Sequence, residues 1–120
     1  MSDYTIKFIK ATTDGKILAE VLREGNNDTV SGYAAENPNC PPEVLAEVLR
    51  RGKNDWVSCK AAYNPNCPLE MLAEVLRRGK DDDVSSLAAL NPNYKNFKLQ
   101  EEQCKKVQVN NLLYGIQVNE

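Results

Sequence analysis

Apolar and charged positions alternate with a helical period around residues 68–78. The apolar residues fall at i, i+1, i+4 and i+5, so they form one stripe on a helix: Met71, Leu72, Val75 and Leu76. Charged residues take the other side, with Glu74 and Arg78 at the favourable i,i+4 spacing. Pro68 suits the first helical position, and Gly79 tolerates the left-handed conformation that ends many helices. The pattern predicts a helix from about Pro68 to Arg78.

A second, shorter helix is predicted after each Arg-Gly or Glu-Gly turn. An aspartate with the side-chain acceptor of an N-cap stands at each start: Asp28, Asp55 and Asp82. Each helix ends at an Asn-Pro-Asn triplet, because the residue before a proline is pushed out of the helical region. About two helical turns fit between these two signals.

These two helices belong to a unit of 27 residues that occurs three times in tandem. The copies are Leu18–Val44, Leu45–Met71 and Leu72–Lys98, and the first two are identical at 19 of 27 positions. Neither helix buries its apolar stripe alone, so the units must stack. The sequence therefore predicts an all-α fold, an α-solenoid of three two-helix repeats in a single domain. Residues 1–17 and 99–120 are expected to form its caps. Two terminal segments, Tyr4–Phe8 and Leu112–Ile116, fit either short strands or frayed ends.

Comparing the copies separates two faces of the second helix. The residues shared by all copies are, in the middle copy, Val57, Ser58, Ala61 and Ala62. The differing residues are Trp56, Cys59, Lys60 and Tyr63, and at 100° per residue they lie on the opposite side. Three residues per turn would mix the two sets, so the pattern favours an α-helix over a 3₁₀ helix. Stacking is expected to hold the shared set, which leaves the differing set free for another purpose.

We expect the differing face, on the short-helix and concave side, to bind a partner. Tryptophan and tyrosine dominate binding hot spots, and the middle of this face contains both. The candidate binding residues are Tyr33, Glu36, Trp56, Lys60, Tyr63 and Asp83. The alternative is packing: Trp56 would fill a groove between units, and Leu87 and Leu90 would lie under the C-terminal cap. An exposed cluster of tryptophan and tyrosine would favour binding.

Composition and charge narrow the classes of function. The formal net charge is −2 and no stretch approaches a membrane span, so we expect no membrane partner and a cytoplasmic location. The chain has no histidine, and its four cysteines form no C-x-x-C pair, so no metal site is expected. Cys40 and Cys67 occupy equivalent positions about 10 Å apart in stacked units, too far for a disulfide. No nucleophile–base pair or phosphate loop points to an enzyme or a cofactor.

The triplet with its neighbours, N-P-N-C-P-x-x-x-L-A-x-x-L, resembles the leucine-rich repeat variant family of bacterial repeat proteins. The motif covers Asn37–Pro41 with Leu45 and Leu49, and Asn64–Pro68 with Leu72 and Leu76. The resemblance implies a right-handed superhelix of alternating long and short helices, the short ones often 3₁₀, and a binding role. The unit here is longer than the usual one of about 24 residues in that family. Ser58-Cys59 replaces its arginine pair, so an anion-binding role is not implied.

The leading hypothesis is a non-catalytic protein–protein interaction module. The alternative is a helical repeat protein that binds nucleic acid, which requires a basic stripe. The differing face offers Lys60 against Glu36 and Asp83. The basic turns of the first helices, Arg50-Arg51 and Arg77-Arg78, are accompanied by aspartates and are expected to be solvated, charge-balanced turns.

Overall fold

A computed structural model describes residues 4–101, and all the regular structure in that range is helical. Residues 92–101 are helical as well. The seven preceding helices are α1 (Ile6–Ala11), α2 (Gly15–Arg23), α3 (Thr29–Glu36), α4 (Pro42–Arg50), α5 (Trp56–Tyr63), α6 (Leu69–Arg77) and α7 (Asp83–Leu90). The predicted all-α class is confirmed for this range.

The strand alternative for Tyr4–Phe8 is wrong. Ile6 and Phe8 belong to α1, which begins where the Thr5 hydroxyl accepts a hydrogen bond from the backbone amide of Phe8 at 3.1 Å. This N-cap and the burial of Ile9 hold the segment helical. Leu112–Ile116 and most of the predicted C-terminal cap lie outside the described residues.

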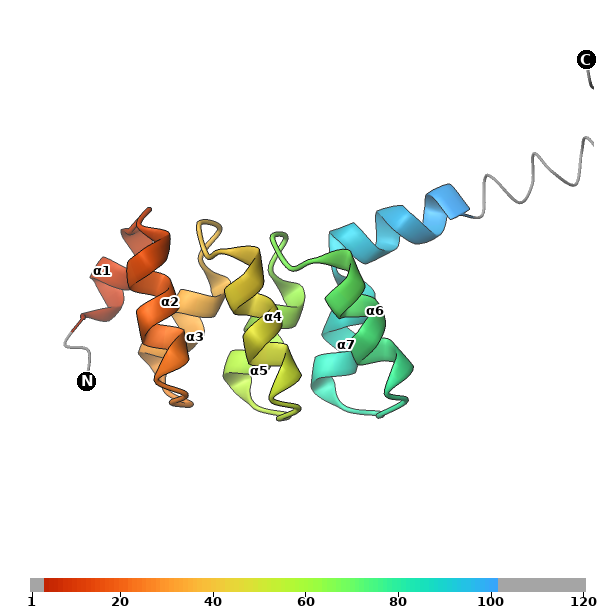
Figure 1. Ribbon diagram of the computed structural model, residues 1–120, viewed down its shortest axis with the longest axis horizontal. Helices are drawn as coiled ribbons and strands as arrows, with labels where there is room; N and C mark the ends of the chain where they lie inside the picture. Colours follow the sequence, from red (N-terminus) through yellow and green to blue (C-terminus); the bar gives the residue numbers. More distant parts are fainter. Residues whose placement is uncertain (1–3, 102–120) are drawn as a thin grey trace, which may run out of the picture.

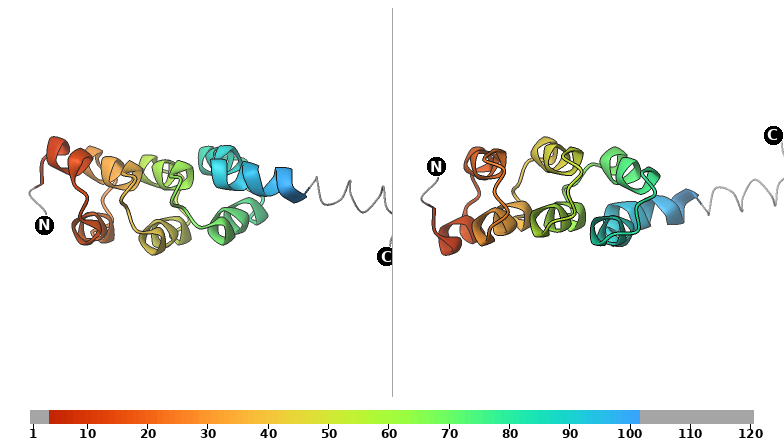
Figure 2. Two further views of the ribbon diagram at one scale, coloured as in Figure 1. Left: turned by 90° about the horizontal axis from the view of Figure 1, so that it is seen from above. Right: turned by 90° about the horizontal axis from the view of Figure 1, so that it is seen from below.

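The helices follow one another along the longest axis (Figure 1), and they form two layers. One layer contains α2, α4 and α6, and the other contains α1, α3, α5 and α7 (Figure 2). Within the second layer α5 contacts α3 on one side and α7 on the other. The differing residues of the three copies therefore come from three neighbouring helices.

The residues predicted to begin and end the helices do so in the structure. The side chains of Asp28, Asp55 and Asp82 accept hydrogen bonds from the backbone amides of Ser31, Ser58 and Ser85 at 2.8–2.9 Å. The glycines that follow α2, α4 and α6 have φ values of +79°, +73° and +71° (Gly25, Gly52 and Gly79). The second helices are α-helical, as the pattern predicted, with eight residues each against nine in the first helices, so the expected alternation of long and short amounts to one residue.

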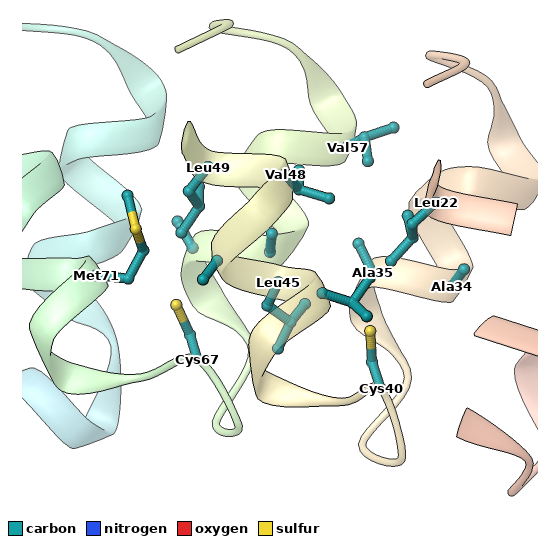
Figure 3. Close-up of a cluster of buried hydrophobic side chains, with 14 of the residues drawn as sticks. Leu22, Ala34, Ala35, Cys40, Leu45, Val48, Leu49, Val57, Cys67 and Met71 are labelled. Atoms are coloured by element: carbon teal, nitrogen blue, oxygen red, sulfur yellow. The ribbon is translucent and has the colours of Figure 1, made fainter. Parts of the chain in front are cut away.

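The apolar core lies between the two layers. Leu45 and Leu49 of α4 are fully enclosed, with Leu22 on one side and Met71 on the other (Figure 3). The second layer contributes mainly alanines, whose small side chains let the helices pack closely: Ala34, Ala35, Ala61, Ala62 and Ala88 are all buried. Cys40 and Cys67 lie on either side of α4 (Figure 3), and the described cysteines are free thiols. Cys104 lies outside the described residues.

Three buried asparagines join successive units by hydrogen bonds. The side-chain amide of Asn64 donates to the carbonyl oxygens of Ala35 at 2.6 Å and Asn37 at 3.0 Å. Asn91 donates to the equivalent oxygens of Ala62 at 2.7 Å and Asn64 at 2.9 Å. Asn37 continues this asparagine ladder to the N-terminal segment. The first asparagine of each triplet thus does more than mark the end of a helix, since it satisfies the orphan carbonyls of the previous unit.

The prediction of solvated basic turns leaves out a contact that two of the arginines form with the preceding unit. The guanidinium of Arg51 donates to the backbone oxygen of Leu22 at 2.8 Å, and that of Arg78 donates to the backbone oxygen of Leu49 at 3.0 Å. Each oxygen belongs to the last turn of the first helix in the preceding unit, where carbonyls lack helical partners and the helix dipole favours a cation. These arginines therefore connect neighbouring units at the edge opposite the asparagine ladder.

Candidate partner-binding groove

The predicted division of the second helix into two faces is confirmed in α5. The shared residues Val57, Ser58, Ala61 and Ala62 are all buried. On the other side, Trp56 is 40% exposed and Tyr63 is 50% exposed. Cys59 and Lys60 lie between them and are half-buried. An exposed tryptophan–tyrosine pair of this kind favours binding over packing alone.

Trp56 is nevertheless also a packing residue. Its ring covers Gly32 of α3, and a Cβ atom at Gly32 would lie 2.1 Å from Cζ3 of the indole. Tyr33 meets the same ring edge to face, with 6.0 Å between ring centroids. The packing alternative is therefore correct for the inner side of this indole, while its outer side remains open to solvent.

Lys60 is held between α3 and α5. Its ammonium lies 3.4 Å from a carboxylate oxygen of Glu36 and 5.6 Å from the ring centroid of Trp56. The first contact is an ion pair and the second is within cation–π distance. A second lysine, Lys10 of α1, lies 4.9 Å from the ring centroid of Tyr33. Two lysines of the chain itself, Lys10 and Lys60, thus lie against the rings of Tyr33 and Trp56.

A groove of about 790 Å³ runs over α5 between α3 and α7. We call it the α5 groove. Its lining residues are Glu36, Trp56, Cys59, Lys60, Tyr63, Asn64, Pro65, Asp83, Ser86, Leu87 and Pro92. Most of these side chains come from the differing positions, so the stacking that buries the shared residues also forms the groove.

The groove brings together five of the six predicted site residues. Tyr33 is the exception: it stands behind Trp56 and lines a smaller hollow of about 320 Å³ with Lys10 and Glu36. Leu87 lies in the wall of the groove, and Leu90 is 50% exposed. Most of the C-terminal cap, under which the packing alternative placed both residues, lies outside the described residues.

Sequence reasoning missed the end of the groove. Asn64, Pro65 and Pro92 close it, and they belong to the triplets that follow α5 and α7. The signal was available, because a triplet directly after the binding helix must lie at the end of that helix.

The walls contain little that is typical of catalysis. Burial raises the pKa of the Cys59 thiol, with a smaller contribution from the negative charge of Asp83, so this thiol is a poor nucleophile at neutral pH. Within residues 4–101, no group of three or more potential metal-binding side chains gathers in one place. None of the helices described there is long and apolar enough to span a membrane.

Comparisons with known proteins give no match: neither a family model, nor a curated protein, nor a solved structure is similar to this chain. The resemblance to the leucine-rich repeat variant family stays a prediction from the motif. The geometry of the α5 groove is thus the main basis for a functional proposal.

Proposed function

We propose that this protein is a non-catalytic interaction module that binds a segment of another protein in the α5 groove. Its architecture is a right-handed α-solenoid of three 27-residue repeats, similar to that of the leucine-rich repeat variant family. The hydrogen bonds that recur from unit to unit support this architecture, because Asn64 and Asn91 repeat the same two contacts 27 residues apart. We place the module in the cytoplasm, where free thiols such as that of Cys59 stay reduced.

The observation that carries the proposal is the open, aromatic groove. Exposed apolar surface with a concave shape and an aromatic lining is typical of a recognition site. Tyr63 is half exposed at the wall, and Trp56 is a rigid indole already fixed by Gly32 and Tyr33. A fixed ring loses little conformational entropy on binding, and this favours its use as an anchor. The alternative of nucleic-acid binding has less support, since the groove lysine, Lys60, is paired with Glu36.

Replacement of Tyr63 tests the proposal without disturbing the core. Tyr63→Ala removes a half-exposed ring, so the free energy of unfolding should change by less than about 0.5 kcal/mol. Binding should weaken by about 2 kcal/mol or more, as truncated hot-spot tyrosines do. Phe97→Ala is a matched control, because Phe97 is 41% exposed and lies outside the groove.

The measurement compares proteins captured from the native cell extract by immobilised wild type, Tyr63→Ala and Phe97→Ala, followed by titration of each purified candidate. A partner retained by wild type and Phe97→Ala and lost by Tyr63→Ala supports the proposal. Partners that all three proteins capture equally would place the binding surface elsewhere, and captured nucleic acid would favour the alternative function.

A further inference from the structure

The α5 groove lies where the third copy of the repeat lacks the large side chain that the middle copy has at the first position of its second helix. Trp56 covers the space between α3 and α5. At the equivalent position, α7 has Asp83. Cys59 stands at the position equivalent to Gly32, and it lines the groove together with Asp83. A short acidic side chain therefore replaces an indole at the second junction, and the space between Trp56 and Leu87 stays open.

The charges of the groove do not cancel. Its lining contains Glu36, Lys60 and Asp83, and Lys60 already pairs with Glu36 at 3.4 Å. The Asp83 carboxylate is exposed, and within residues 4–101 it forms no hydrogen bond or ion pair with another side chain or backbone group. The two N-cap carboxylates beside it are directed to their own helices: Asp55 accepts from the Ser58 amide and Asp82 from the Ser85 amide. Asp83 thus leaves one negative charge at the groove.

The positions along the helices set the layout of a ligand. Asp83 is the first residue of α7, and Leu87 lies four residues further, about 6 Å along the axis at 1.5 Å per residue. Trp56 begins α5, the helix over which the groove runs, and Tyr63 ends it. The groove therefore offers a carboxylate at one end of α7 and the apolar side chain of Leu87 about 6 Å further along the same helix. Side chains two apart in an extended segment, or four apart in a helix, have the same separation.

We propose that the occupant is a basic, amphipathic peptide segment, in which a Lys or Arg reaches Asp83 while an aliphatic or aromatic side chain lies between Trp56 and Leu87. This inference rests on the proposed function of the α5 groove and names the chemistry of its partner. Complementary charge directs the encounter and fixes the orientation of the segment, and the apolar contact supplies most of the affinity.

The test is selection of a random linear decapeptide library on immobilised protein. Three proteins are compared: wild type, Asp83→Lys, and the control Glu70→Lys, which makes the same charge change on the exposed surface of α6, outside the groove. Thermal melts first verify that all three are folded. Wild type and Glu70→Lys should enrich peptides with Lys or Arg two or four positions from an apolar residue. Asp83→Lys should lose this preference or favour Asp and Glu.

One selected peptide, labelled with a fluorophore, then gives the affinity. Asp83→Asn should weaken its binding by about three- to tenfold at low salt, and high salt should reduce the difference because an exposed ion pair is screened. Enrichment of apolar peptides without a basic residue would overturn the inference and leave the proposed function intact. Equal basic enrichment on wild type and Asp83→Lys would also overturn it. Failure to enrich any peptide on wild type would overturn both.

Discussion

The indole of Trp56 and the missing side chain of Gly32 fit one another across the junction between α3 and α5. A Cβ atom at Gly32 would stand 2.1–2.6 Å from three carbons of the ring, so no other residue fits while the ring keeps its place. Gly32 has a helical conformation that any residue adopts, since its φ is not positive. Glycine is therefore required at this position because it leaves space for the ring, and not because of its conformational freedom.

Gly32→Ala should consequently have opposite effects in two backgrounds. With Trp56→Ala, it should stabilise the protein by about 0.5–1 kcal/mol, because alanine is the better helix former. With Trp56 present, the methyl group must displace the ring, and we expect a loss of about 1 kcal/mol instead. Denaturant unfolding of the four proteins measures the coupling, and tryptophan emission should shift to the red as the ring moves into water. Equal effects in both backgrounds would show that the ring does not occupy this place.

The two faces of α5 could be predicted from the sequence, but the contact between Trp56 and Gly32 could not. Positions that a stack buries are the same in every copy, so Val57 and Ala61 were identified by comparing copies alone. Trp56 and Gly32 are not equivalent positions, since they lie 24 residues apart in a 27-residue repeat. Their contact depends on how far one helix is shifted along its neighbour, which comparing copies does not give.

The asparagine ladder was hidden for a different reason. The Asn-Pro-Asn triplet carries a strong local signal for the end of a helix, and that signal explained it completely. Asparagine is usually exposed, so its burial at Asn64 and Asn91 was not expected from residue type. The role of Arg51 was missed similarly, because arginines beside aspartates are typical of solvated turns.

The second asparagine of the triplet forms different hydrogen bonds in different copies, and this difference allows a test. The side-chain amide of Asn66 donates to the backbone oxygens of Pro38 and Cys40 in the preceding unit. Within residues 4–101, the side-chain amide of its equivalent Asn39 donates only inside its own triplet, to Asn37 Oδ1 at 3.3 Å. Asn66→Ala should therefore cost about 1–2 kcal/mol of unfolding free energy, and Asn39→Ala less than about 0.5 kcal/mol. Urea unfolding of both variants measures the two losses of unfolding free energy. Equal losses would mean that the contacts between units contribute nothing.

The two sides of α4 should differ strongly in their sensitivity to truncation. Leu49 is 2% exposed in the continuous core, so Leu49→Ala should cost about 2–5 kcal/mol through the cavity it leaves. Glu47 lies on the outer side and forms an exposed ion pair with Arg23 at 2.9 Å, so Glu47→Ala should cost less than about 1 kcal/mol. Denaturant melts compare the two variants, and similar costs would contradict the assigned core.

The buried thiols predict a loss of stability in alkali. Burial raises the pKa of Cys40 and of Cys67 from an ordinary value of 9.0 to about 12. Above pH 9 the unfolded chain releases these two protons, while the folded protein still retains them. The unfolded state then binds fewer protons, so the free energy of unfolding falls as pH rises from about 9 to 12 and is unaffected by these groups below 9.

A variant without the two thiols separates this effect from the titration of lysines and tyrosines. Cys40→Ala/Cys67→Ala should be less stable than wild type at pH 7, because each truncation leaves a small cavity in the core. Its stability should nevertheless fall less steeply between pH 9 and pH 11, since only the wild type loses the contribution of the protonated thiols. Urea midpoints at pH 7, 9, 10 and 11 give both slopes. Parallel slopes would mean that the thiols ionise as easily in the folded protein as in the unfolded chain, and Cys40 and Cys67 would then not lie in the core.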